Sequence, residues 1–215
     1  DSILRMIGIY GGMFDPIHFG HLRPALEVQQ ALDLSEVRFI PCGQPPHRQQ
    51  PEASALQRLA MVRAAIAGQP GFSVDDREVV RSGASYMVDT LRSLRSELAD
   101  TPLCLIVGFD AFVGIQSWSR WQLLFELAHL VVTHRPGWSK QDLMNDEALA
   151  SLIAAREASA AKLAQDEAGK LCFLPVTQLD IASTTIRSLI QQGRDIRYLL
   201  PDNVYELIEK QNIYG

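Results

Sequence analysis

Short runs of apolar residues alternate along the chain with longer stretches in which apolar residues recur every three or four positions. The short runs predict buried strands, and the longer stretches predict helices with one apolar face. The predicted strands lie at 6–10, 37–41, 103–108, 130–133 and 171–174, and an extended stretch is expected at 72–80. The predicted helices lie at 21–32, 55–67, 86–98, 120–128, 184–192 and 202–211.

The regular alternation of strands and helices predicts an α/β fold. We expect a doubly wound, Rossmann-like, mostly parallel sheet with helices on both faces, because connections between parallel strands need crossover helices of this length. Ligands of such folds bind beyond the carboxyl ends of the strands, where the strand order reverses. We therefore expect the functional residues to lie directly after the strands.

The length of 215 residues predicts a single domain over 1–215. We expect a Rossmann-like core over 1–180 and a small helical segment over 181–215 that completes it. The segment at about 139–170 differs from the rest because it is alanine-rich and weakly patterned. It predicts a helical insertion, or a partly mobile segment, at an edge of the sheet.

The amino-acid composition argues against some classes of binding partner. Hydrophobic residues make up 47% of the chain and charged residues 21%, which is typical of a soluble globular protein. The formal net charge of -5 argues against a protein that binds nucleic acid or an anionic membrane surface. The longest apolar run, 103–115, contains Asp110 and is too short to cross a bilayer. Any anionic ligand must therefore be bound by local features of a site.

The cysteines indicate a reducing compartment. Cys42, Cys104 and Cys172 are odd in number and form no C-x-x-C pair, so neither a disulfide framework nor a cysteine zinc cluster is expected. The first residues lack the long apolar region and cleavage site of a signal peptide. Together these features predict a cytoplasmic protein.

The segment 11–21, Gly-Gly-Met-Phe-Asp-Pro-Ile-His-Phe-Gly-His, lies between the first predicted strand and helix. Gly11 and Gly12 allow the backbone to approach a ligand, so that its N–H groups and the helix start can bind phosphate oxygens. His18 and His21 are spaced to face one ligand. Two alternatives stay open, namely an ordinary turn with surface histidines and a zinc site, although no nearby ligand cluster completes the latter.

A second segment, Ile-Ala-Ser-Thr-Thr-Ile-Arg at 181–187, opens a predicted helix near the C-terminus. Ser183 or Thr184 is a suitable N-cap, which alone could explain both. Arg187 lies about one turn inside the helix, where a cation opposes the helix dipole. A phosphate or an acidic partner would account for that position.

These two segments together resemble the paired signature of the nucleotidylyltransferase superfamily. Pieces between them resemble the bacterial nicotinate-nucleotide adenylyltransferases, so that the resemblance spans almost the whole chain. The pieces are Pro-Pro-His-Arg at 45–48, Ser-Tyr-Met-Val-Asp-Thr-Leu at 85–91, Gly108 with Asp110, Trp118, and Arg-Pro-Gly at 135–137. Met13 and Met87 depart from the family, which usually has a hydroxyl residue at these positions.

The resemblance implies transfer of the AMP moiety of ATP to nicotinate mononucleotide, giving deamido-NAD and pyrophosphate, with Mg²⁺ accompanying ATP and no metal ligand from the protein. The implied catalytic residues are His18, His21 and Arg187. The implied ATP-binding residues are Gly11, Gly12, Met13, Phe14, His18, His21, Gly108, Asp110, Ser183, Thr184 and Arg187. The implied mononucleotide-binding residues are His47, Arg48, Ser85, Tyr86, Met87, Trp118, Ser119 and Arg135.

Other readings of the same residues stay open. Asp110 could simply cap a helix, and Trp118 with Trp121 could form the apolar face of one. The whole chain could be a relative that acts on nicotinamide mononucleotide or phosphopantetheine, or a nucleotide-binding module without turnover. The sequence does not predict an oligomeric state.

Overall fold

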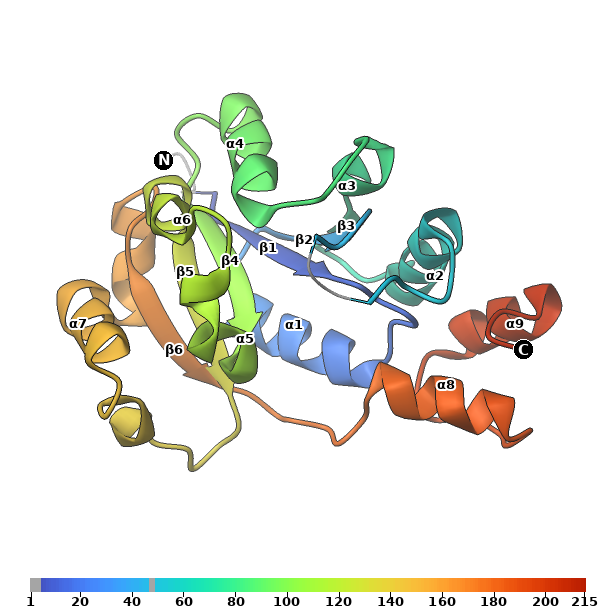
Figure 1. Ribbon diagram of the computed structural model, residues 1–215. Helices are drawn as coiled ribbons and strands as arrows, with labels where there is room; N and C mark the ends of the chain where they lie inside the picture. The colour runs from blue at the N-terminus through green and yellow to red at the C-terminus, as the bar shows by residue number, and fades with distance from the viewer. Residues whose placement is uncertain (1–4, 47–48) are drawn as a thin grey trace.

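A six-stranded sheet forms the centre of the protein in a computed structural model that describes residues 5–46 and 49–215 (Figure 1). The strands are β1 (Ile7–Gly12), β2 (Glu36–Pro41), β3 (Phe72–Val74), β4 (Leu103–Gly108), β5 (His129–His134) and β6 (Leu171–Pro175). Their order is β3-β2-β1-β4-β5-β6, and every neighbouring pair is parallel. The predicted doubly wound α/β fold is confirmed.

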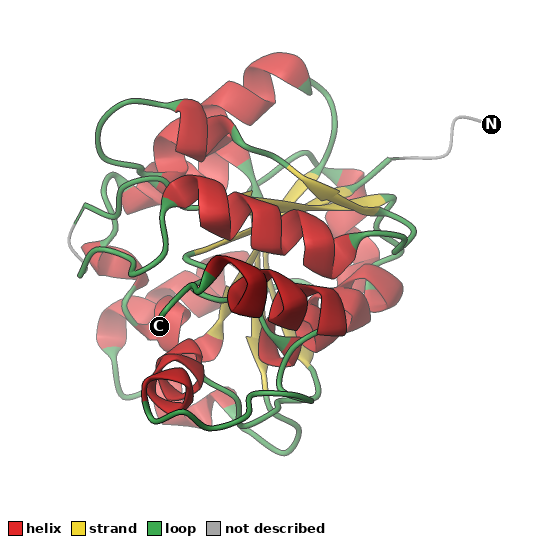
Figure 2. Ribbon diagram, turned by 90° about the vertical axis from the view of Figure 1, so that its right-hand side faces the viewer, coloured by secondary structure: helices red, strands yellow, loops and turns green. Residues whose placement is uncertain are grey.

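One face of the sheet is covered by four helices that come from the two ends of the sequence. They are α1 (Phe19–Ala31), α2 (Ala55–Ile66), α8 (Ser183–Gln191) and α9 (Asp202–Gln211). Val28, Met61, Ile186 and Val204 are buried from these helices in one apolar cluster. Figures 1 and 2 show α8 and α9 beside the early helices, so the C-terminal segment packs close to the start of the chain.

The opposite face is covered by helices from the middle of the sequence. They are α4 (Met87–Glu97), α5 (Phe109–Val113), α6 (Trp121–Leu127) and α7 (Glu147–Arg156). Strand residues supply the two faces alternately, as the pleat requires: Leu105 and Val107 of β4 face this cluster, whereas Cys104 and Ile106 face the other. The near-continuous apolar runs predicted as strands are thus explained by burial on both faces.

The extended prediction over 72–80 is wrong beyond β3. A one-turn helix, α3 (Arg77–Val80), follows instead. Asp75 accepts a hydrogen bond from the Arg77 backbone N–H at 3.1 Å, and the Asp76 carbonyl accepts from Val80 N–H at 3.0 Å. These local bonds overcome the preference of the valines for extended structure.

The segment 139–170 connects β5 to β6 and is largely helical. It consists of the 3-10 turns η2 (Lys140–Leu143) and η3 (Ala160–Gln165) on either side of α7. Leu149 and Ile153 are buried against one face of the sheet, and Leu163 is buried against the other. The segment therefore contributes to both apolar clusters, while the division into a core and a C-terminal segment at residue 180 stays a prediction.

The strand order reverses between β1 and β4, which are neighbours in the sheet although two strands separate them in sequence. The connection after β1 runs to one side of the sheet, and the connection after β4 runs to the other. A ligand site is expected at their carboxyl ends. Among the described residues, no helix is long and apolar enough to cross a membrane.

Arg58 of α2 joins the segments that leave β1 and β2. Its side chain is 1% exposed, and its guanidinium donates to the carbonyl oxygens of Met13 at 2.9 Å, Cys42 at 2.6 Å, Gly43 at 3.2 Å and Ala53 at 3.3 Å. Five N–H groups on a planar fork make such a set of contacts possible for arginine alone. Arg58 thus fixes the loops beside the switch point.

We expect Arg58→Met to lower the free energy of unfolding by about 3 kcal/mol or more, because each buried carbonyl left without a donor costs on the order of 1–3 kcal/mol. Urea unfolding measures this loss. Arg63→Met is the control, since the Arg63 side chain lies on the same helix and is 59% exposed. Equal stability of the two variants would contradict the structural role of Arg58.

Candidate active site

The loop after β1 brings His18 and His21 together at the start of α1. His18 precedes the helix, and its Nδ1 accepts a hydrogen bond from Gly20 N–H at 3.0 Å. His21 Nδ1 accepts from His18 N–H at 3.2 Å, and the two rings stack with centroids 3.8 Å apart. Since both Nδ1 atoms act as acceptors, both rings carry their proton on Nε2.

Burial keeps this histidine pair neutral. It lowers the pKa of His18 to about 4, and it lowers the pKa of His21 well below the ordinary histidine value, with a smaller contribution from His18. Phe14, 1% exposed, packs edge-on against His21 at 5.2 Å. The pair therefore offers two neutral N–H donors at neutral pH.

Two glycines permit close contacts around this loop. A Cβ at Gly20 would lie 2.8 Å from the His18 ring and 3.3 Å from the Ile181 carbonyl oxygen. A Cβ at Gly11 would lie 2.7 Å from the terminal methyl of Met87. The loop can approach both the C-terminal segment and α4 because these positions have no side chain.

The segment 181–187 binds directly to the segment 11–21. Arg187 Nη1 donates to the Asp15 carbonyl oxygen at 2.8 Å, and Ser183 Oγ donates to the Pro16 carbonyl oxygen at 2.9 Å. The N-cap prediction for Ser183 or Thr184 is wrong, since Ala182 precedes α8 and Ser183 is its first residue. The Ser183 hydroxyl instead joins two segments that are far apart in sequence.

Asp15 has more polar contacts than the sequence suggested. Its carboxylate, in a residue 4% exposed, accepts from Glu52 N–H at 2.9 Å, Ala53 N–H at 3.1 Å and the Tyr214 hydroxyl at 2.6 Å. Arg187 Nη1 lies 3.7 Å from the same carboxylate. Sequence reasoning missed both Asp15 and Tyr214; the Asp-Pro pair inside the first motif was the only available signal for Asp15.

Arg187 retains donor capacity after these contacts. Its Nε is buried, forms no hydrogen bond with any described residue, and lies 3.4 Å from Glu52 Oε1. An arginine in this position can bind an anionic group of a ligand in addition to its structural partner Asp15. The second motif thus places a cation next to the histidine loop.

A hollow of about 470 Å³ opens beside the histidine loop, between the ends of β1 and β4. It brings together nine of the residues predicted from the sequence. They are Gly11, Gly12, Met13, Ser85, Tyr86, Met87, Gly108, Trp118 and Ser119. Cys42, Pro45, Pro46 and Glu78 also line it, and of these Glu78 is a buried acidic residue that the sequence did not single out.

The start of α4 forms one wall of this hollow. Tyr86, Met87 and Val88 line it, and no side chain caps the helix at Tyr86. The N–H groups of a first helical turn have no partner within the helix and carry a partial positive charge. This wall can therefore receive an anionic group such as a carboxylate.

Several predicted residues lie outside the lining of this hollow. Asp110 is exposed in the first turn of α5, which Gly108 precedes, so the N-cap reading of Asp110 is wrong. Arg135 is exposed directly after β5, and Thr184 is exposed in α8. The Phe14 side chain lies in the apolar core. His47 and Arg48 are outside the described residues.

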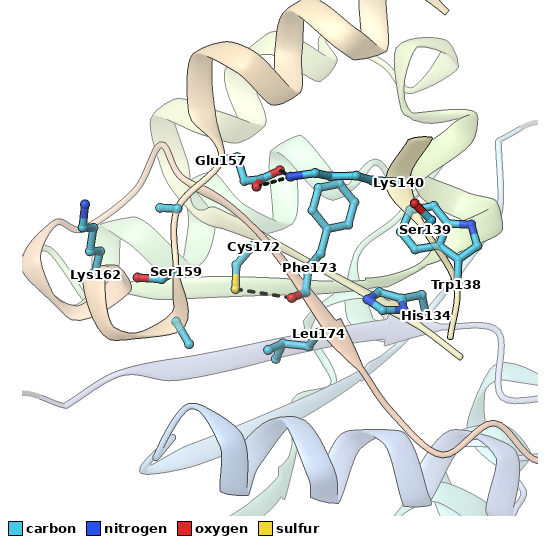
Figure 3. A pocket seen from close by; sticks show the side chains of 12 residues that line it. His134, Trp138, Ser139, Lys140, Glu157, Ser159, Lys162, Cys172, Phe173 and Leu174 are labelled. Carbon is cyan, nitrogen blue, oxygen red and sulfur yellow. Dashed lines mark hydrogen bonds and ion pairs between the residues drawn. The ribbon is translucent and has the colours of Figure 1, made fainter. Parts of the chain in front are cut away.

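A second hollow, of about 650 Å³, lies at β6, the edge strand of the sheet (Figure 3). Figure 3 shows Trp138 and Phe173 beside it, with Lys140 bound to Glu157 at 2.7 Å across its upper side. It contains none of the residues predicted to bind a ligand. His18, His21, Ser183 and Arg187 do not line the hollow at the switch point, but they lie on the loop that begins at its wall or bind to that loop. The candidate active site therefore consists of this hollow and the adjoining histidine loop.

Comparisons with known proteins show the family of the chain. The family model described as cytidylyltransferase-like matches residues 9–189. A protein of Methylococcus capsulatus named "Probable nicotinate-nucleotide adenylyltransferase" is 52% identical over 212 residues, covering 98% of this chain and 100% of the relative. A protein of Halorhodospira halophila with the same name is 50% identical over 99% of this chain and 96% of its own length.

The solved structures support the fold alone, because sequence identity to them is low. The nicotinic acid mononucleotide adenylyltransferase of Plasmodium falciparum, complexed with NaAD, has a TM-score of 0.73 and 18% identity over 98% of this chain and 97% of that chain. The family match over 9–189 and the 52% identity across nearly the whole chain show that this protein belongs to the cytidylyltransferase-like family and, within it, to the nicotinate-nucleotide adenylyltransferases.

Proposed function

We propose that this chain transfers the adenylyl group of MgATP to the phosphate of nicotinate mononucleotide. The products are deamido-NAD and pyrophosphate. The observation that carries the proposal is the contact between the two distant motifs: Arg187 binds the Asp15 carbonyl at 2.8 Å, three residues before His18. Gly12 and Met13, at the start of the same loop, line the hollow that Trp118 also lines. The relatives at 52% and 50% identity carry the name "Probable nicotinate-nucleotide adenylyltransferase".

The reaction needs no nucleophile from the protein. A phosphate oxygen of the mononucleotide attacks the α-phosphorus of ATP, the new P–O bond forms, and the bond to the β-phosphate oxygen breaks as pyrophosphate leaves. The protein must align the two substrates and stabilise the negative charge on the oxygens of the transferred group. Fixed hydrogen-bond donors perform both tasks.

We assign the catalytic donors to His18, His21 and Arg187. The Nδ1 acceptor contacts of the two stacked histidines fix their tautomers and leave both Nε2–H groups available to phosphate oxygens. Arg187 adds a positive charge beside Asp15. Backbone N–H groups of the loop 11–14 complete the phosphate site, so Phe14 contributes through its backbone.

The other ATP contacts follow from the strand ends. Gly108 ends β4 and Asp110 follows it in α5, where an exposed carboxylate can accept hydrogen bonds from ribose hydroxyls. Ser183 and Thr184 begin α8, and their backbone N–H groups are available to a phosphate.

The mononucleotide occupies the hollow in this proposal. Trp118 stacks on the pyridine ring, and the uncapped start of α4 at Tyr86 and Met87, with Ser85 and Ser119 nearby, receives the nicotinate carboxylate. N–H donors favour the acid over the amide, whose NH₂ group would face another donor. Arg135, His47 and Arg48 are proposed for the mononucleotide on the resemblance alone.

Magnesium enters as part of the substrate. Among the described residues there is no group of three or more His, Cys, Asp or Glu side chains that could hold a metal ion. A magnesium ion bound mainly by triphosphate oxygens and water fits this donor set, since Mg²⁺ keeps much of its hydration in phosphate complexes. The cytoplasmic location stays a prediction from the cysteines.

Incubation of the protein with MgATP and one acceptor at a time tests the proposal. We expect rapid pyrophosphate release with nicotinate mononucleotide and slow release with nicotinamide mononucleotide or phosphopantetheine, because only the first presents a carboxylate to the start of α4. Release with none of them would overturn the enzymatic proposal. A preference for the amide would overturn the carboxylate site but not adenylyl transfer.

His21→Asn should lower kcat by about 10²–10³-fold, because it removes one donor to developing charge while its amide oxygen can still accept from His18 N–H. Steady-state kinetics with saturating substrates measures the effect, and thermal unfolding confirms that the variant folds. Arg23→Ala is the control, since Arg23 lies on the same helix and pairs with Glu27 at the surface. Near-normal turnover of His21→Asn would exclude His21 as a phosphate donor.

The neutral state of His18 predicts a pH-dependent stability. Because the folded pKa of about 4 lies below the ordinary value, the unfolded chain binds the proton first as pH falls. The contribution of neutral His18 to the free energy of unfolding is therefore complete above about pH 6.5 and is lost as the pH falls towards 4. Between pH 7.5 and 4.5, we expect wild type to lose roughly 2–3 kcal/mol more free energy of unfolding than His18→Asn, which keeps an N-cap acceptor. Equal losses in urea unfolding would contradict a neutral buried His18.

A further inference from the structure

Glu78 of α3 is the one charged side chain among the described residues that line the hollow. It is 4% exposed, and burial raises the pKa of its carboxyl. A carboxyl group in such a place costs free energy that an apolar side chain of similar size would not. The hydrogen bonds and packing contacts of Glu78 indicate its role.

The Glu78 carboxylate binds the first turns of α4. Its Oε2 accepts a hydrogen bond from the Thr90 hydroxyl at 2.7 Å, and Thr90 is fully buried. Arg81 Nη1 donates to the same hydroxyl oxygen at 3.3 Å. Thr90 lies one helical turn after Tyr86, and its backbone N–H donates to the Tyr86 carbonyl at 3.2 Å. Glu78 is thus connected through Thr90 to the residues that line the hollow.

The backbone of Glu78 lies against the opposite wall. A Cβ at Gly43 would be 2.1 Å from the Glu78 carbonyl oxygen, so α3 packs directly on the strand end that leads into Pro45 and Pro46. Ser85 N–H donates to the Gln44 carbonyl at 2.8 Å and completes the connection between the two walls. The separation between the 43–46 wall and the start of α4 therefore depends on where Glu78 sits.

We propose that Glu78 is a positioning residue for the mononucleotide, which fixes through the Thr90 hydroxyl the distance between the uncapped start of α4 and the wall formed by 43–46. This inference rests on the proposed function, because it assigns the hollow to the mononucleotide. Glu78 acts on the affinity of that substrate and not on that of ATP, because the proposed phosphate donors His18, His21 and Arg187 do not line the hollow.

A second connection between α3 and α4 supplies a matched control. Arg77 Nη1 donates to Ser93 Oγ at 2.8 Å, and Nη2 donates to Glu97 Oε2 at 3.1 Å. Ser93 and Glu97 lie farther along α4 and do not line the hollow. Ser93→Ala weakens the contact between the two helices without touching the Glu78–Thr90 bond.

The test compares Thr90→Val, Thr90→Ser, Glu78→Gln and Ser93→Ala with wild type. The dissociation constant of nicotinate mononucleotide is measured by calorimetry without ATP, and the KM values of both substrates and kcat are measured by pyrophosphate release. Thr90→Val, which removes the hydroxyl at nearly constant volume, should weaken mononucleotide binding about tenfold, the effect of losing one hydrogen bond to a charged group. Thr90→Ser should restore it, and Glu78→Gln should have an intermediate effect.

The KM for ATP should change by no more than about twofold in all four variants, and Ser93→Ala should bind the mononucleotide as wild type does. Parallel changes in both KM values, or an equal effect of Ser93→Ala, would show a merely structural role and overturn the inference. Failure of wild type to bind the mononucleotide would overturn it as well. If wild type binds the mononucleotide without releasing pyrophosphate, the proposed function fails, while the calorimetric comparison still decides the role of Glu78.

Discussion

The candidate site depends on one buried carboxylate. Asp15 lies inside the first motif and accepts hydrogen bonds from the segment before α2, at Glu52 and Ala53, and from Tyr214 near the C-terminus. Its backbone carbonyl binds Arg187 of the second motif. A buried carboxylate is costly unless donors surround it, so these four segments must meet for Asp15 to be accommodated. The same requirement that satisfies Asp15 brings both halves of the proposed phosphate site together.

Several residues serve the fold and the proposed chemistry with different atoms. His18 and His21 use Nδ1 to close the start of α1, and this use determines that Nε2 carries the proton. Arg187 uses one amino group to bind Asp15 and keeps its buried Nε without a hydrogen bond among the described residues. The structural contacts of these residues and the proposed phosphate-binding function are therefore compatible. For the histidines, the cap is what preorganises the donors.

Most of the fold could be predicted because the strands are buried on both faces and the longer helices carry one apolar face, which are properties of local sequence. The errors arose where a specific contact decides the structure. Asp75 and Asp76 turn the end of the 72–80 stretch into α3, and Ser183 binds Pro16 rather than its own helix. The partners of Asp15, Arg58 and Glu78 could not be predicted at all. Tyr214 lies 199 residues from Asp15, and no local pattern indicates which buried polar groups will meet.

The net charge of -5 is compatible with anionic substrates because the site proposed to bind them offers mainly neutral donors. The proposed donors are two neutral imidazoles, the loop N–H groups and the uncapped start of α4, which attract phosphate and carboxylate oxygens over short range. The positive charge of Arg187 is already partly neutralised by Asp15 and Glu52. A site of fully charged lysines would bind ATP and pyrophosphate strongly before and after reaction. Catalysis requires interactions that strengthen in the transition state, and fixed neutral donors gain most as charge develops on the transferred group. Burial of the histidine pair, which keeps both rings neutral, is thus a property of the fold that supports the proposed role of the pair in turnover.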